Sequence, residues 1–146
     1  MNQKDKKILY KDISSRLPYN VRIDYNGEIY EIVGISHGRL ILCKPFMSHT
    51  IEDCPLVEEV KPCLFPLESM SEEDLNNFYE TIRPVIEDAL DEYKKDKKEY
   101  ENERPITIKD IKTDIVAIEW MLERHYDIYG LIEKGLAKDV SKMNIY

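Results

Sequence analysis

The eight residues VRIDYNGE, at positions 21–28, decide the fold class of this 146-residue chain. Apolar residues at 21, 23 and 25 alternate with charged residues at 22 and 24, which is typical of a strand with one face in the core and one in water. The Asn26-Gly27 pair favours a two-residue hairpin turn, because both of its residues tolerate a positive φ. The pattern therefore predicts an antiparallel hairpin whose second strand covers residues 28–35.

Two more strands and a short helix are predicted around this hairpin. Residues 39–43 are apolar on both faces, which is typical of a central strand, and residues 56–60 predict a weaker fourth strand that ends before Pro62. Apolar residues at helical spacing predict a short helix over residues 8–17, ended by Pro18. Four short antiparallel strands cannot bury both faces unaided, so we expect either a small barrel or a sheet with helices on one side.

The pattern becomes helical at Ser71. This residue, with Asp74 three positions later, predicts a capped helix start. Apolar residues then recur every three or four positions and keep their phase across Pro84, so we expect one long helix that is kinked at the proline. Further helices are predicted over residues 108–124 and 128–137.

Together these elements predict an α+β fold with two regions. Residues 1–70 are expected to contain the N-terminal helix and the small sheet, and residues 71–146 a helical region that packs on it. A chain of this length is enough for one ordinary domain, so we expect the two regions to form a single compact unit.

The composition is that of a globular chain. Apolar residues make up 42% and charged residues 34%, with a mean hydropathy of −0.50. No apolar run approaches the roughly 20 residues that span a bilayer, and the basic N-terminus lacks the apolar core of a secretory signal. Three cysteines without such a signal favour reduced thiols. We therefore expect a cytoplasmic protein that does not enter a membrane.

Charge is distributed unevenly along the chain. The formal net charge is −8, and nearly all of it comes from residues 71–146, which carry 12 basic and 19 acidic residues. An acidic field repels phosphate, which makes nucleic acid an unfavourable partner.

Residues that could ligate a metal or attack a substrate are scattered. The soft metal ligands of the central segment are Cys43, His49, Cys54 and Cys63. Their spacing lacks the paired C-x-x-C knuckles of zinc sites, so we expect no bound metal. Nothing in the sequence orients His37 or His125 beside a cysteine, and the five glycines are too dispersed for a phosphate-binding loop. We accordingly expect no cofactor and no enzymatic activity, with chemistry at Cys43, His49 and His125 as a third alternative.

The first candidate binding surface is on the last long helix. Val116 and Trp120 lie one turn apart, on the side opposite the apolar stripe Ile111, Ile115, Ile118 and Leu122. Such a pair is either buried against a second neighbour or available to a partner protein, for which tryptophan is a frequent hot spot.

The second candidate surface is on the strands. Arg22, Tyr25, Tyr30 and Arg39 could bind a nucleic acid by stacking and charge if they shared one surface. The same tyrosines would serve equally well as half-buried strand residues. Nucleic-acid binding through the strands is therefore the alternative to protein binding.

Three parts of the chain carry a resemblance to other proteins. They are LYKD with LPY at 9–12 and 17–19, VKPCLFPLESMSEE at 60–73, and HYDIYGLIEKGLA at 125–137. In this order they resemble a family of small uncharacterised proteins encoded by gut bacteria, their phages and integrated mobile elements. That family often has glycine where Asn20 stands. It also often has a second histidine where Arg124 stands, and because this chain has arginine there, the resemblance implies no His-His metal pair.

The resemblance implies an accessory protein of a phage, a mobile element or its bacterial host, and it implies no catalytic activity. With the composition and the residue patterns, it leads us to expect a non-catalytic module that binds another protein. The Val116/Trp120 side of the last helix, or the acidic face of the long helix, is the expected contact surface. The identity of the partner and the oligomeric state remain open.

Overall fold

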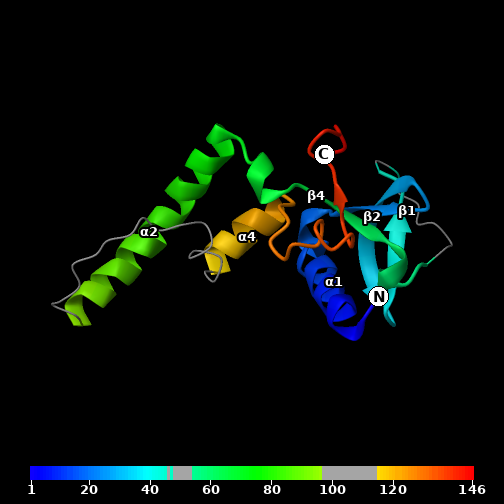
Figure 1. Cartoon of the computed structure of the whole chain (residues 1–146), viewed down its shortest axis with the longest axis horizontal. Helices are drawn as coiled ribbons and strands as arrows, with labels where there is room; N and C mark the ends of the chain where they lie inside the picture. Colours follow the sequence, from blue (N-terminus) through cyan, green and yellow to red (C-terminus); the bar gives the residue numbers. More distant parts are fainter. Residues whose placement is uncertain (46, 48–53, 97–114) are drawn as a thin grey trace. The chain divides into compact units, whose positions relative to one another are not determined.

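The computed structural model describes residues 1–45, 47, 54–96 and 115–146, which form an α+β fold (Figure 1). The described helices are α1 (Gln3–Ser15), α2 (Glu72–Asp96) and α4 (Ile115–Glu123). The described strands are β1 (Arg22–Tyr25), β2 (Glu28–Ser36), β3 (Arg39–Cys43), β4 (Lys61–Leu64) and β5 (Lys138–Asp139). The chain divides into two compact units, one formed by Met1–Ser69 with Met121–Tyr146 and the other by Met70–Trp120.

The predicted hairpin is confirmed and forms the middle of the sheet. Strands β1 and β2 are antiparallel, and Asn26 and Gly27 at their turn have φ angles of 55° and 84°. The strand order is β3-β2-β1-β4-β5, with β4 antiparallel to β1 and β5 parallel to β4. The described strands therefore form an open mixed sheet, and the barrel alternative is wrong.

The fourth strand lies later in the chain than predicted. Val57–Glu59 form a single helical turn, stabilised by a hydrogen bond of 2.7 Å from the Leu56 N–H to the Glu59 carboxylate. Strand β4 follows this turn and includes Pro62, which lies opposite Ile23. Proline disfavours a strand interior because it has no N–H to donate, but β4 pairs with β1 through only two residue pairs, so the loss is small.

Helix α1 and one face of the sheet form the core of the first unit. Asn2 caps the helix by accepting a hydrogen bond of 2.8 Å from the Asp5 N–H, so the helix begins at Gln3, before the predicted residue 8. Its inner face buries Leu9 and Ile13 completely. These two side chains belong to one buried cluster with Val21, Ile23, Ile32, Leu40, Leu42, Val57, Val60, Leu64, Leu131 and Ala137.

In the second unit, α2 begins as predicted. Ser71 Oγ accepts a hydrogen bond of 3.0 Å from the Asp74 N–H and caps the helix. The helix continues through Pro84 as a single element, as the uninterrupted apolar phase indicated. Its inward-facing residues include Phe78 and Ile82, which are both buried.

The C-terminal region differs from the prediction in two ways. Helix α4 covers only Ile115–Glu123 of the predicted helix, whose residues 108–114, with Ile111 of the stripe, lie outside the described residues. Turns and bends replace the helix predicted over 128–137, and the short strand β5 follows them. Gly130 and Gly135 adopt positive φ angles of 65° and 67°, which interrupt a right-handed helix.

Candidate functional site

The two residues predicted to bind a partner, Val116 and Trp120, differ in their exposure. Trp120 is 6% exposed, and its ring meets the Phe78 ring edge-on, with 5.1 Å between centroids. Val116, one turn earlier on α4, is 36% exposed, and its neighbour Ile115 is 72% exposed. The side of α4 that carries Val116 and Trp120 therefore runs from an exposed first turn to a buried tryptophan.

The four strand residues considered for nucleic-acid binding do not share one face of the sheet. Tyr25 and Tyr30 pack against the core of the first unit, with their ring centroids 6.3 Å apart. Arg22 lies on the opposite face, because side chains alternate along β1, and Arg39 lies on the face opposite the buried Leu40. The aromatic and the basic groups are thus on different sides.

Carboxylates accompany the basic residues on this second face of the sheet. Arg22 forms an ion pair with Glu31 at 3.3 Å, and Lys138 of β5 bonds the carboxylate of Asp24. Arg39 donates a hydrogen bond of 2.8 Å to the Cys54 carbonyl. The face has a mixed charge rather than a basic one.

Two of the three cysteines are buried as neutral thiols. Cys43 and Cys63 are buried, and Cys54 is half-buried. Burial raises the pKa of the Cys63 thiol to about 12 and also raises that of Cys43, so both thiols are protonated at neutral pH. His49 lies outside the described residues, and within the described part no group of three His, Cys, Asp or Glu side chains could hold a metal ion.

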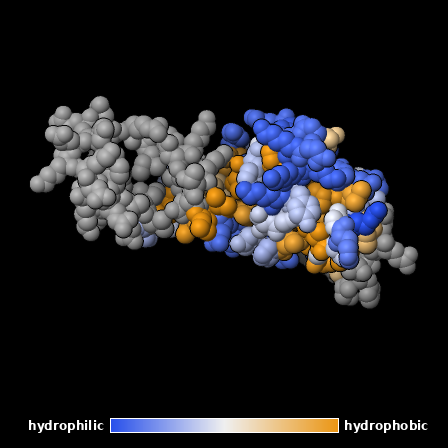
Figure 2. All heavy atoms as spheres, turned by 90° about the horizontal axis from the view of Figure 1, so that it is seen from below, coloured by the Kyte–Doolittle hydropathy of each residue, from blue (hydrophilic) through white to orange (hydrophobic). Residues whose placement is uncertain are grey.

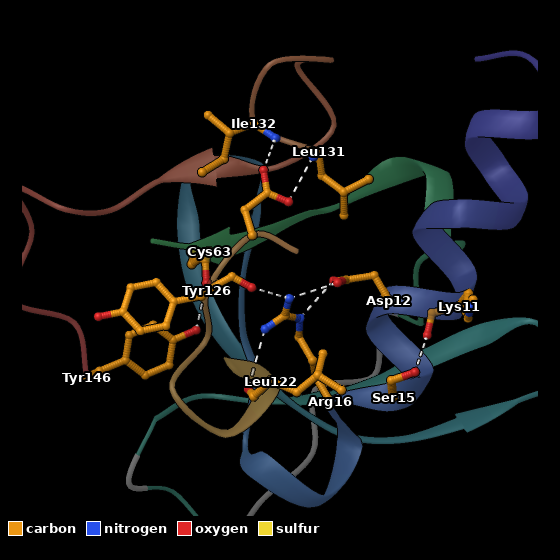
Figure 3. A network of polar contacts seen from close by, with 11 residues as sticks. Lys11, Asp12, Ser15, Arg16, Cys63, Leu122, Tyr126, Leu131, Ile132 and Tyr146 are labelled. Atoms are coloured by element: carbon orange, nitrogen blue, oxygen red, sulfur yellow. Dashed lines mark hydrogen bonds and ion pairs between the residues drawn. The ribbon is translucent and has the colours of Figure 1, made fainter. Parts of the chain in front are cut away.

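Sequence reasoning missed a buried ion pair, which Figure 3 shows. Arg16 and Asp12 are both fully buried, and two hydrogen bonds of 2.9 and 2.8 Å join the guanidinium to the carboxylate. The guanidinium also donates to the carbonyls of Leu122 and Tyr126, at 3.4 and 2.7 Å. Because these four acceptors come from separate segments, the guanidinium joins α1 to the end of α4 and to the segment after it. The i, i+4 spacing of the two residues was visible in the sequence, but nothing there marked them as buried.

The side chain of Asp127, which lies in the loop after α4, holds that loop in place. The carboxylate of Asp127 accepts hydrogen bonds of 2.8 Å from the N–H groups of both Leu131 and Ile132. Burial raises the pKa of Asp12, against the attraction of Arg16, and the carboxylate of Asp127 raises it further. Asp127 thus holds the loop, and its negative charge disfavours the ionised form of Asp12.

A second missed cluster surrounds Tyr146. His125 is buried, its ring is stacked on the Tyr146 ring with centroids 4.0 Å apart, and its Nδ1 has no hydrogen-bond partner among the described residues. Burial, with Arg16 and Arg22 nearby, lowers the pKa of His125 to about 4, so the imidazole is neutral at pH 7. The cluster was not visible in the sequence because its residues are far apart along the chain.

The fold is that of an α+β protein. No protein-family model, curated protein or solved structure matches the chain. None of the described helices combines the length and apolar character needed to cross a membrane.

Proposed function

We propose that this chain is a non-catalytic module that binds another protein through the first turn of α4. The observation that carries the proposal is the exposure of two adjacent aliphatic side chains, Ile115 and Val116, at the start of this helix. Aliphatic surface in water is unfavourable, and burying it against a partner recovers free energy in proportion to the area covered. Figure 2 shows that apolar surface is interspersed with hydrophilic residues on the face it draws.

The buried Trp120 stabilises the helix that carries this surface. Its edge-on contact with Phe78 joins α4 to α2 within the second unit. A rigid support lowers the conformational entropy that a partner must remove on binding. Trp120 therefore positions the first turn, and the exposed aliphatic residues make the contact.

Charge indicates the chemistry of the partner. Helix α2, in the same unit, contains nine acidic and three basic residues. A complementary partner presents basic residues around an apolar centre, because opposite charges speed the encounter and exclude wrong partners. We therefore propose a partner protein with a basic surface that surrounds exposed apolar side chains.

The resemblance to small proteins of gut bacteria, phages and mobile elements supports an accessory role in such a genome or in its host. Accessory proteins of this kind need no chemistry of their own.

A capture experiment tests the proposal. Immobilised full-length protein is compared with the double variant Ile115→Ser/Val116→Ser and with Val33→Ser, which removes an aliphatic side chain that is 56% exposed in the first unit. A partner protein from a host lysate should be retained by the wild type and by Val33→Ser and lost by the double variant. Equal capture by all three proteins, or no protein retained by the wild type, contradicts the proposed surface.

A further inference from the structure

The ring of Tyr146 occupies a slot built from separate segments of the first unit. On one side it stacks on His125, with 14° between the ring planes. The Phe65 ring lies 5.7 Å away, tilted by 48°, and the guanidinium carbon of Arg22 lies 5.4 Å from the ring centroid. Two aromatic rings and a cation thus surround one phenol ring, and each favours an aromatic guest.

The hydroxyl of Tyr146 enters the sheet where the ladder between β1 and β4 ends. The last paired residues are Ile23 with Pro62, so Arg22 and Cys63 would form the next pair. Instead, the Arg22 N–H donates to the Tyr146 hydroxyl at 3.1 Å. The hydroxyl in turn donates to the Cys63 carbonyl at 2.8 Å, as Figure 3 shows. A phenol can accept one bond and donate the other at once, whereas a phenylalanine ring can do neither.

When Tyr146 leaves the slot, the groups that contacted it lose their partner. The N–H of Arg22 and the carbonyl of Cys63 lose their shared partner, and the buried face of His125 loses its stacked ring. The bond to the Cys63 carbonyl is partly buried, and a backbone group that water reaches poorly is unfavourable without a partner. The slot is therefore specific for a group that combines an aromatic ring with a hydroxyl.

The segment that brings Tyr146 to the slot is only lightly held. Residues 141–144 are exposed. Their backbone N–H groups bond locally, that of Ser141 to the Asp139 carboxylate and that of Met143 to the Val140 carbonyl. Tyr146 is thus the main side-chain anchor of this segment on the body of the first unit.

We propose that the slot formed by Arg22, Cys63, Phe65 and His125 is a binding site for the tyrosine side chain of a partner peptide, and that Tyr146 occupies it as an intramolecular competitor. The ligand class follows from the fit of the chain's own tyrosine, whose ring stacks on His125 and whose hydroxyl bonds both the Arg22 N–H and the Cys63 carbonyl. A peptide that supplies a tyrosine can displace residues 141–146, because the exposed part of this segment adds little to its hold. The site lies in the first unit and does not depend on the proposed contact at α4.

The test uses the full-length variant Tyr146→Ala, which empties the slot. The probe is the fluorescently labelled hexapeptide Ser-Lys-Met-Asn-Ile-Tyr, the sequence of residues 141–146. We expect saturable binding to Tyr146→Ala, at least about tenfold weaker binding to the wild type, and a further loss of about tenfold or more when the probe ends in phenylalanine. Tyr10→Ala, which removes an exposed tyrosine of α1, is the matched control and should bind like the wild type.

Three results would overturn the proposal. They are no saturable binding to Tyr146→Ala, equal affinity for the tyrosine and phenylalanine probes, and binding to Tyr10→Ala as tight as to Tyr146→Ala. Tyr146→Phe provides a second variant that keeps the stacked ring and the fold. It should bind the tyrosine probe with an affinity between those of the wild type and Tyr146→Ala, and an affinity equal to that of the wild type would also count against the site.

Discussion

At the scale of single residues, Arg16 is the side chain that most firmly connects distant parts of the first unit. It is fully buried, and it bonds both the carboxylate of Asp12 and two carbonyls that lie more than 100 positions later. A buried cation is stable only when its donors are used, and here the chain supplies acceptors from two segments. The residue therefore fixes how the segment after α4 packs beside α1.

Replacing this guanidinium should strongly destabilise the protein. We expect Arg16→Met to lower the free energy of unfolding by about 3–5 kcal/mol, because Asp12 would remain buried without its partner. Urea unfolding followed by circular dichroism measures the loss. Arg39→Met, at an exposed position, should cost less than about 1 kcal/mol. The double variant Asp12→Leu/Arg16→Met should recover part of the stability, and a single variant as stable as the wild type would contradict the role assigned to Arg16.

His125 should make the stability depend on pH. Its pKa of about 4 in the folded protein lies below the ordinary value of 6.5, so the unfolded chain binds the proton more readily. The stabilisation is present in full above pH 6.5 and is lost as the pH falls through 4, by a total of about 3 kcal/mol. Urea midpoints measured between pH 7 and pH 4 test this expectation.

His125→Asn should flatten that pH profile, since asparagine does not titrate and tolerates the positive φ of 60° at this position. His37 also has a positive φ, of 52°, and is exposed, so His37→Asn is the matched control and should keep the slope of the wild type. A slope that survives in His125→Asn would assign the pH dependence to other groups.

At the scale of elements, α4 shows how burial and exposure alternate within a few residues. Ala117 and Met121 are fully buried, whereas Ile115, predicted to lie on the apolar stripe, is exposed. The predicted apolar stripe rests on long aliphatic residues. A helix can also bury a small residue such as Ala117 where two backbones approach closely. Hydrophobicity alone therefore did not give the phase of this helix.

Trp120 should behave as a core residue in a stability measurement. Because its ring is buried against Phe78, we expect blue-shifted tryptophan emission and a loss of about 3–5 kcal/mol on Trp120→Ala, from the lost transfer free energy and the cavity left behind. Val116→Ala, one turn earlier and more exposed, should cost less than about 1 kcal/mol. Red-shifted emission with a small loss would return Trp120 to the predicted role of an interface hot spot.

The elements that the sequence predicted correctly are those with local causes. Asn26-Gly27 determines its own turn, and Ser71 caps its own helix through a hydrogen bond to Asp74. The predicted helix over 128–137 failed because Asp127 bonds two backbone N–H groups there and Gly130 takes a positive φ. Apolar spacing looked helical in this segment, yet side-chain bonds to the backbone decided its path.

At the scale of the whole molecule, the largest difference from expectation is the return of the chain to its first unit. Residues 121–146 supply β5, which pairs in parallel with β4 across more than 70 positions of sequence. They also supply His125 and Tyr146 of the tyrosine slot. Long-range parallel pairing has no local sequence signal, because a strand of two residues shows no period. The candidate slot could therefore not be predicted from the sequence, although the sequence contains each of its residues.

Nucleic-acid binding is the alternative function, and the charge distribution of the whole molecule argues against it. We expect no appreciable affinity for single-stranded or duplex DNA at physiological salt, because the net charge is −8 and Arg22 is paired with Glu31. Tyr25 and Tyr30 are half-buried against the core, so part of each ring is already covered and less of it is left for stacking on bases. Fluorescence anisotropy with labelled oligonucleotides, titrated at 50 and at about 150 mM salt, measures the affinity and its salt dependence. Micromolar binding that weakens steeply with salt and is lost in Arg22→Ala/Arg39→Ala would favour the strand surface over the protein-binding role, because neutralised phosphates release counterions in that way.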